Sequence, residues 1–238
     1  MITNLIITNN EIQFPSIGKA FTQNTTISVA ANMREALKEM TDIDTDEVTV
    51  QMNSPVIIVP KEQLEDEDAT ALYNLSISEV DEETIVVQQP IEFTSLGGSD
   101  TELVALFAIS KDLNTVIEDH FKKYDFLHVG IQQFVASVSS ESNSSAKEGV
   151  AKILSLKNHL LTAFFCDNIM YAYAMKQGRL NFFNRYEATN AHDCAYMLLS
   201  IWKQLGYSQL KDDLHLTGEV SFMEELKELL GEFIKNIH

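Results

Sequence analysis

The stretch DDLHLTGEVSFMEELKELL, residues 212–230, contains the pattern that decides the fold. It predicts a short apolar strand, a turn at Gly218 and an amphipathic helix opened by Ser221, with Glu224 completing a capping box. In many α/β proteins a strand that ends in two glycines before a helix lets the backbone approach a nucleotide closely. Here Glu219 stands in the second glycine position, so the corner raises the question of whether it is a nucleotide site.

The segments before this stretch extend the pattern into a mixed sheet. Residues 159–166 (HLLTAFFC) predict one strand, and residues 168–186 predict two more that are joined by a turn at Gly178. Residues 191–206 predict a helix that ends at a glycine and carries Trp202 on its buried stripe. The second half therefore has the order strand, strand, strand, helix, strand, helix.

The first half shows the same order of elements. Residues 5–40 align by pattern with 169–206, and residues 47–64 align with 213–230. In this alignment the first half begins with a hairpin at 4–14, so we expect its first strand to be missing or to lie outside this chain. Two halves, each with a mixed sheet built on a three-stranded meander, define the ribonuclease-H-like module, whose duplication gives the actin-like ATPase fold. We therefore predict an α/β protein of this class.

Four short motifs between residues 180 and 219 follow one another in a distinctive order. They are L-x-F-x-N, a helix with D-x-x-Y-x-L-L, then Q-L-G, and finally L-x-L-x-G-E. This order resembles a bacterial family of unknown function that has a degenerate actin-like ATPase fold. Residues 102–113 (ELVALFAISKDL) and 126–130 (FLHVG) are similar to the middle region of that family. The resemblance implies the fold and assigns no chemistry. The actin-like components of type IV pilus and type II secretion machines, which serve as assembly scaffolds, are an analogy of fold alone.

A serine-rich stretch at 139–149 has the composition of a linker. We place the domain boundary near it, which gives an N-terminal ribonuclease-H-like half at 1–135 and a C-terminal half at 136–238. An ordinary surface loop within one domain is the alternative interpretation of this stretch.

The chain of 238 residues is acidic, with a formal net charge of -18. The excess of acidic residues is concentrated between 35 and 102 and repels phosphate backbones, so we expect no nucleic-acid partner. A solvated acidic surface explains this charge, and a basic protein partner is compatible with it. No apolar run is long enough to span a bilayer, the start lacks a signal-peptide pattern, and the two cysteines fit no metal or disulfide spacing. We therefore expect no membrane insertion and a cytoplasmic location.

A working actin-like ATPase needs phosphate-binding hairpins rich in glycine, because backbone N–H groups must approach the phosphate oxygens. The hairpin turn of the second half is CDNIM, which contains Asp167 and Asn168 but no glycine, and that of the first half is TNNE. At the strand–helix corner Thr217 and Gly218 remain, but Glu219 adds a side chain and a negative charge. We interpret these five residues as the positions of a degenerate nucleotide site. We expect no cofactor, no metal and no catalytic residue.

Other candidate groups are weaker. His192, Asp193 and Cys194 are consecutive on a helix, where neighbours point about 100° apart, so they cannot form a catalytic triad. His159 and His215 each lie near the start of a strand and approach each other in the repeat, but they lack the carboxylate spacing of a metal site.

The sequence favours a catalytically silent protein of the actin-like ATPase fold that binds an unidentified protein partner as a scaffold or regulator. The alternative is a nucleotide-binding ATPase or kinase-like enzyme with divergent phosphate loops. A small-molecule hydrolase with an unrecognised pocket is a further rival. Titration with nucleotide distinguishes the first two hypotheses, whereas the sequence sets neither the partner nor the oligomeric state.

Overall fold

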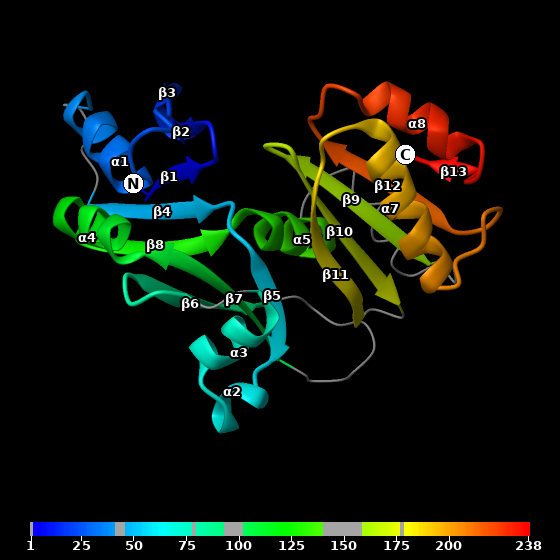
Figure 1. The fold of residues 1–238 in the computed structure, drawn as a ribbon, viewed down its shortest axis with the longest axis horizontal. Coiled ribbons are helices and arrows are strands. Elements are labelled where there is room, and N and C mark those ends of the chain that lie inside the picture. Colours follow the sequence, from blue (N-terminus) through cyan, green and yellow to red (C-terminus); the bar gives the residue numbers. More distant parts are fainter. Residues whose placement is uncertain (1, 41–45, 78–79, 93–101, 140–158, 177–178) are drawn as a thin grey trace. The chain divides into compact units, whose positions relative to one another are not determined.

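The computed structural model describes residues 2–40, 46–77, 80–92, 102–139, 159–176 and 179–238 (Figure 1). These residues form two compact units. One contains the described residues up to Gln132 and the other those from Gln133 to His238, so the change of unit falls within helix α5 (Val129–Ser139). The serine-rich stretch that we expected to mark the boundary lies, from residue 140 onward, outside the described residues.

The first unit is built on a five-stranded mixed sheet with the order β3-β2-β1-β4-β8. Its first three strands form an antiparallel meander, and β1, β4 and β8 run parallel to one another. Alternate residues of the central strands, among them Leu5 and Val50, are buried with the apolar stripes of helices α1 and α4. The elements are β1 (Ile2–Ile7), β2 (Glu11–Phe14), the 3-10 turn η1 (Pro15–Ile17), β3 (Lys19–Thr22), α1 (Val29–Lys38), β4 (Glu47–Met52), α4 (Lys111–His120) and β8 (Lys123–His128).

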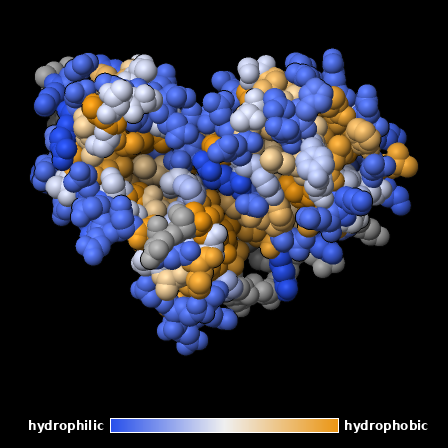
Figure 2. Space-filling model, viewed as in Figure 1, coloured by the Kyte–Doolittle hydropathy of each residue, from blue (hydrophilic) through white to orange (hydrophobic). Residues whose placement is uncertain are grey.

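A separate three-stranded antiparallel sheet, β5-β7-β6, is inserted in the first unit between β4 and β8. It comprises β5 (Val56–Pro60), β6 (Thr84–Ile91) and β7 (Leu103–Ser110), with the short helices α2 (Gln63–Asp66) and α3 (Ala69–Ser76). Helix α3 begins after Asp68, whose carboxylate accepts the N–H groups of Thr70 and Ala71. Figure 2 shows hydrophilic side chains over the tip that contains α2, in agreement with a solvated acidic segment.

The second unit repeats the sheet order of the first as β11-β10-β9-β12-β13. Helices α7 and α8 pack against one another and bury one face of this sheet, with Leu198, Trp202 and Leu226 in the core (Figure 1). On the opposite face, the ring of Phe134 in α5 lies 5.2 Å from the ring of Tyr173. The elements are β9 (Leu160–Cys166), β10 (Ile169–Lys176), β11 (Arg179–Glu187), α7 (Ala191–Gln204), β12 (Asp213–Gly218), α8 (Met223–Gly231) and β13 (Asn236–Ile237).

The strand pairings correct our alignment of the two halves. In each unit the first strand of the meander pairs in parallel with the strand after the helix, β1 with β4 and β9 with β12. Strand β1 is therefore equivalent to β9, and the first strand that we expected to be missing is β1 itself. An alternating apolar pattern does not distinguish the first strand of a meander from the second, which is why our alignment was displaced by one strand.

The start of α8 also differs from our expectation. The helix begins at Met223 after Phe222, and no side chain caps its first turn, so Ser221 and Glu224 do not form a capping box. Glu224 instead forms an ion pair with Lys227 one turn later, with 3.2 Å between the carboxylate oxygen and Nζ.

Candidate functional site

The turn between β9 and β10 consists of Asp167 and Asn168, flanked by the paired residues Cys166 and Ile169. Both turn residues have positive φ angles, 52° and 60°. This is the pattern of a two-residue hairpin turn, in which Asn and Asp tolerate the left-handed region better than other side chains. The N–H of Ala188 donates to the carbonyl of Asn168 at 2.7 Å and ties the turn to the chain after β11. A turn this short leaves no extra residues to wrap around a phosphate.

The strand–helix corner of the second unit is tightly packed against β9. Gly218 lies in register with Phe165 and has a φ angle of +84°, and a Cβ atom at this position would lie 2.0 Å from the Phe165 carbonyl oxygen. The N–H of Glu219 donates to the same oxygen at 3.3 Å. The backbone that Gly218 allows to approach is therefore that of Phe165, which already fills the space beside the glycine.

The parallel register of β9 and β12 brings the predicted site residues together at one edge of the sheet. Thr217 and Gly218 lie opposite Phe164 and Phe165, immediately before the turn that contains Asp167 and Asn168. Glu219 follows as an exposed side chain. The hydroxyl oxygen of Thr217 is buried and has no hydrogen-bond partner among the described residues. This carboxyl edge is where open α/β sheets place their ligands.

In the first unit, the equivalent turn between β1 and β2 uses its backbone donors internally. The Thr8 hydroxyl oxygen accepts the N–H of Asn10 at 3.4 Å and that of Glu11 at 3.0 Å. The Gln23 side chain donates to the Thr8 carbonyl, and the Gln23 N–H donates to the carbonyl of Asn10. A phosphate-binding turn presents such N–H groups to the ligand, whereas here a threonine hydroxyl accepts their hydrogen bonds.

Three side chains beside the β9–β10 turn define its electrostatics. Tyr171 is fully buried, and burial raises the pKa of its hydroxyl, while the guanidinium of Arg185 acts in the opposite direction. Burial, and then the charge of Asp167, raises the pKa of the Cys166 thiol, so this cysteine is a poor nucleophile. We missed Arg185 from the sequence, because its position beside Tyr171 follows from the register of β10 and β11.

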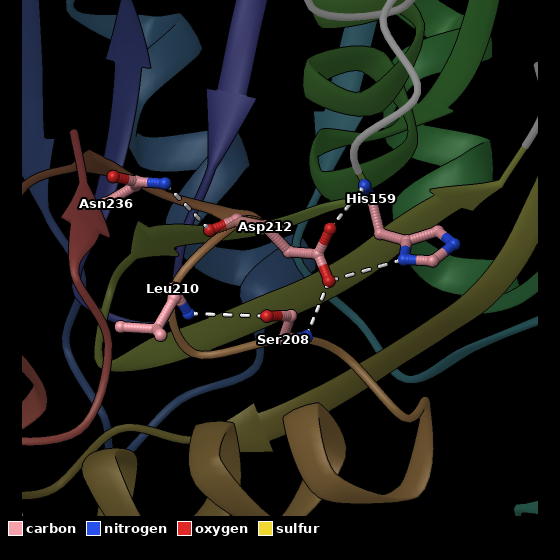
Figure 3. A network of polar contacts seen from close by, with 5 residues as sticks. All are labelled: His159, Ser208, Leu210, Asp212 and Asn236. Atoms are coloured by element: carbon pink, nitrogen blue, oxygen red, sulfur yellow. Dashed lines mark hydrogen bonds and ion pairs between the residues drawn. The ribbon is translucent and has the colours of Figure 1, made fainter.

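A second polar cluster surrounds Asp212 at the start of β12 (Figure 3). The Asp212 carboxylate accepts the N–H of His159 at 2.9 Å and that of Ser208 at 2.5 Å, and it contacts Nδ1 of His159 at 3.3 Å. Burial opposes the charged carboxylate, but these hydrogen bonds from Ser208 and His159 outweigh it and lower the pKa of Asp212. The cluster joins the loop before β12 to the start of β9.

The imidazole of His159 has a second neighbour in this region. Its ring stacks on that of Tyr207, with 4.7 Å between the centroids. His215 instead lies against His238, with 4.9 Å between the ring centroids, so each of the two histidines that we considered as a pair has another ring partner. Across the described ranges, no three His, Cys, Asp or Glu side chains form a group that could hold a metal ion.

His192, Asp193 and Cys194, which follow one another at the start of α7, also have separate roles. Cys194 is fully buried in the core, and burial raises the pKa of its thiol to about 11. The Asp193 N–H donates to the side chain of Asn190, which caps the helix, and His192 lies 3.7 Å from a carboxylate oxygen of Glu225. These contacts are structural and provide no nucleophile paired with a base.

Two sheets of identical strand order, each covered by a pair of helices, define a protein of the actin-like ATPase fold class. The chain belongs to the DUF3822 family, described as a protein of unknown function, which matches residues 5–237. The resemblance drawn from the motifs is thus confirmed. Among curated proteins, no sequence matches this chain.

Solved structures that are similar to this chain over nearly all of its length include a protein of unknown function and a pilus biogenesis complex. A Bacteroides thetaiotaomicron protein with an actin-like ATPase fold and unknown function has a TM-score of 0.76 and 21% identity, covering 99% of this chain and 89% of that one. The PilM–PilN type IV pilus biogenesis complex has a TM-score of 0.54 and 10% identity, covering 99% of this chain and 83% of that one. The predicted fold class is therefore confirmed.

Proposed function

We propose that this protein is a catalytically silent actin-like ATPase-fold protein that acts as a scaffold or regulator by binding another protein. The observation that carries the proposal is the internal hydrogen bonding of the β1–β2 turn. Thr8 accepts the N–H groups of Asn10 and Glu11. A bound phosphate would have to displace this hydroxyl before it could use the same donors, each of which already has a hydrogen-bond acceptor within the turn.

The strand–helix corner of the second unit supports the same proposal. Its glycine is required for the approach of β12 to β9, and the N–H of Glu219 is already bonded to Phe165. The Glu219 carboxylate adds negative charge where a triphosphate would lie. Phosphate sites normally supply glycine backbone donors, a lysine and Mg²⁺-holding carboxylates together. A chain with a formal net charge of -18 also gives no long-range attraction to a polyanion.

The protein-binding part of the proposal rests on a comparison of fold. The PilM structure is that of a type IV pilus biogenesis complex with PilN, so that protein of similar fold forms a complex with another protein. We extend this mode of action to the present chain, with a protein as the partner rather than a nucleic acid. Within the described parts of the chain, no helix is both long and apolar enough to cross a membrane. Both cysteines are free, and we propose a cytoplasmic location on this ground.

Calorimetric titration with Mg·ATP tests the catalytic silence. We expect no dissociation constant tighter than about 1 mM, which corresponds to about -4 kcal/mol. Thr8→Val tests the role of the threonine hydroxyl. It keeps the shape of the side chain and removes the acceptor that is hydrogen-bonded to the N–H groups of the turn. Micromolar binding by the wild type that is lost in Asp167→Ala would contradict the proposal and favour a working ATPase or kinase-like enzyme with divergent phosphate loops.

A further inference from the structure

A groove lies between the edge strand β3 and helix α1 of the first unit. It encloses a cavity of about 280 Å³. The buried side chains of Ile12 and Ala36 are among its lining residues, together with Phe21, and Glu35 and Glu39 line it from the helix. This volume is below that of most small-molecule sites and suits one or two side chains of a larger ligand.

The strand side of the groove presents backbone groups that no described strand pairs with. Strand β3 is the last strand of its sheet, and no described strand pairs with its outer side. The Gln23 N–H donates inward to Asn10, and bonding alternates along an antiparallel strand, so the N–H and C=O groups of Ala20 and Thr22 point outward. Both residues are exposed and line the cavity. An unpaired edge of this kind is a template for another extended chain.

The helix side of the groove is rigid and negatively charged. Helix α1 is capped by Ser28, whose hydroxyl accepts the N–H of Ala31. Asn32, one turn into the helix, is fixed because its side chain bonds the backbone of Asn24 and of Ser28. Glu35 and Glu39 lie one turn apart along the same side of the helix.

The basic residues of α1 do not line the cavity. At 3.6 residues per turn, Arg34 lies about 100° around the helix from Glu35, and Lys38 lies about 60° from Glu35. Among these charged residues, only the two glutamates line the cavity. The groove therefore combines an apolar floor, an unpaired strand edge and a pair of carboxylates.

We propose that this groove binds an extended, basic segment of a partner protein, which adds to β3 as a further strand and places a Lys or Arg side chain against Glu35 and Glu39. The free donors and acceptors of Ala20 and Thr22 supply the main-chain bonds, and the cavity takes an apolar side chain of the segment. This is the mode in which strand addition gives affinity and side-chain pockets give specificity. The inference rests on the proposed function and names the chemistry of its partner.

The kind of ligand that fits the groove is inferred from the chemistry of its strand side and its helix side. An amphipathic helix would leave the outward N–H and C=O groups of β3 unpaired, whereas an extended chain satisfies them. Nucleic acid and other polyanions are repelled by the two carboxylates. A basic side chain with an apolar stem matches both the cavity floor and the carboxylates on the helix.

The test is a selection from a random library of twelve-residue peptides on the full chain. We expect enriched peptides to contain Lys or Arg flanked at alternate positions by β-branched residues. Their affinity should fall about three- to tenfold for Thr22→Pro, which removes one outward N–H without breaking the β2–β3 ladder. It should fall about two- to fivefold for the double variant Glu35→Gln/Glu39→Gln.

The controls separate recognition from loss of folding. Glu224→Gln/Glu228→Gln, an exposed pair with the same spacing on α8, should leave the affinity unchanged. N-methylation of alternate peptide residues should abolish binding and leaves the protein untouched, so this arm stays decisive even if Thr22→Pro unfolds. Ala20→Pro provides a second edge variant.

Two kinds of result would overturn the inference. One is a selection that enriches no peptide, or only acidic ones. The other is an enriched peptide that binds equally after N-methylation or to the Glu35→Gln/Glu39→Gln chain. Either result leaves the proposed catalytic silence standing, since that proposal fails only if Mg·ATP binds in the micromolar range.

Discussion

The close approach of Gly218 to Phe165 can be measured by replacing the glycine with alanine. The new Cβ atom would lie 2.0 Å from the carbonyl oxygen of Phe165. The alanine would also have to keep a φ angle of +84°, which residues with a side chain rarely adopt. The left-handed backbone alone costs about 1 to 2 kcal/mol. To reach van der Waals distance, β12 must also move away from β9, which breaks the hydrogen bond from Glu219 to Phe165 at about 1 kcal/mol and loosens the packing around it. We expect a total of about 3 to 5 kcal/mol.

Gly206→Ala is the matched control for this substitution. Gly206 ends α7 with a φ angle of +70°, but a Cβ atom there would meet nothing within 4 Å. This control should therefore lose only the stability that the left-handed backbone costs, about 1 to 2 kcal/mol. The difference between the two variants isolates the collision with Phe165.

Denaturation by urea, followed through Trp202 fluorescence, measures both variants in the same unit. Trp202 is the single tryptophan of the chain and is buried in the core of the second unit. For a chain of this length, the loss expected for Gly218→Ala lowers the melting temperature by about 6 to 20 °C. Equal destabilisation of the two variants would refute our argument that Gly218 serves the contact between β12 and β9.

Three further predictions concern stability. Trp202→Ala should cost about 3 to 5 kcal/mol by thermal unfolding, and an unchanged melting temperature would contradict this. Trp202→Phe should cost much less, because Nε1 of the indole has no hydrogen-bond partner in the part of the chain that the structure describes. Replacing Glu65, Asp66 and Glu67 by Gln should change the unfolding free energy by less than about 1 kcal/mol. By contrast, Asp68→Ala removes the cap of α3 and should cost about 1 kcal/mol in urea titrations. Because the pKa of Asp212 is lowered in the folded state, its contribution to stability is complete above the usual Asp pKa of about 4 and is lost as the pH falls through the lowered value. Urea midpoints measured through this acid range should therefore fall more steeply for the wild type than for Asp212→Asn, and parallel curves would show that the carboxylate is not responsible.

Most strands and helices, and their duplication, could be predicted from local patterns, but the short strand β13 that follows α8 was not. Periods of two and of 3.6 in the apolar residues mark elements such as β4 and α7, and these patterns are set by residues close in sequence. The equivalence of β1 with β9 was missed because it depends on pairing between distant strands. Only the parallel register of Leu5 with Val50 shows which strand begins the meander.

The candidate site was predictable in position but not in detail. The sequence marked Asp167 and Gly218 by their place after strands, and the parallel register brings both to one edge of the sheet. That Gly218 faces a backbone oxygen, and that Thr8 occupies the donors of its own turn, are matters of a few ångströms that no pattern of residue types encodes. The same holds for Arg185 beside Tyr171, whose neighbours are fixed by strand register.

The insertion between β4 and β8 has a consequence for the order in which the two units fold. In the first unit, β4 pairs with β8 across the whole β5–β7 sheet and α4, since Glu47 lies opposite Lys123. In the second unit, Asp213 pairs with Asn236 across little more than one helix. The longer loop adds only about 1 kcal/mol of closure entropy, but pairing between distant segments slows the approach to the transition state far more than it affects equilibrium stability. We therefore expect the second unit to acquire protected amides first in a refolding experiment with pulsed hydrogen exchange, while the central sheet of the first unit closes last.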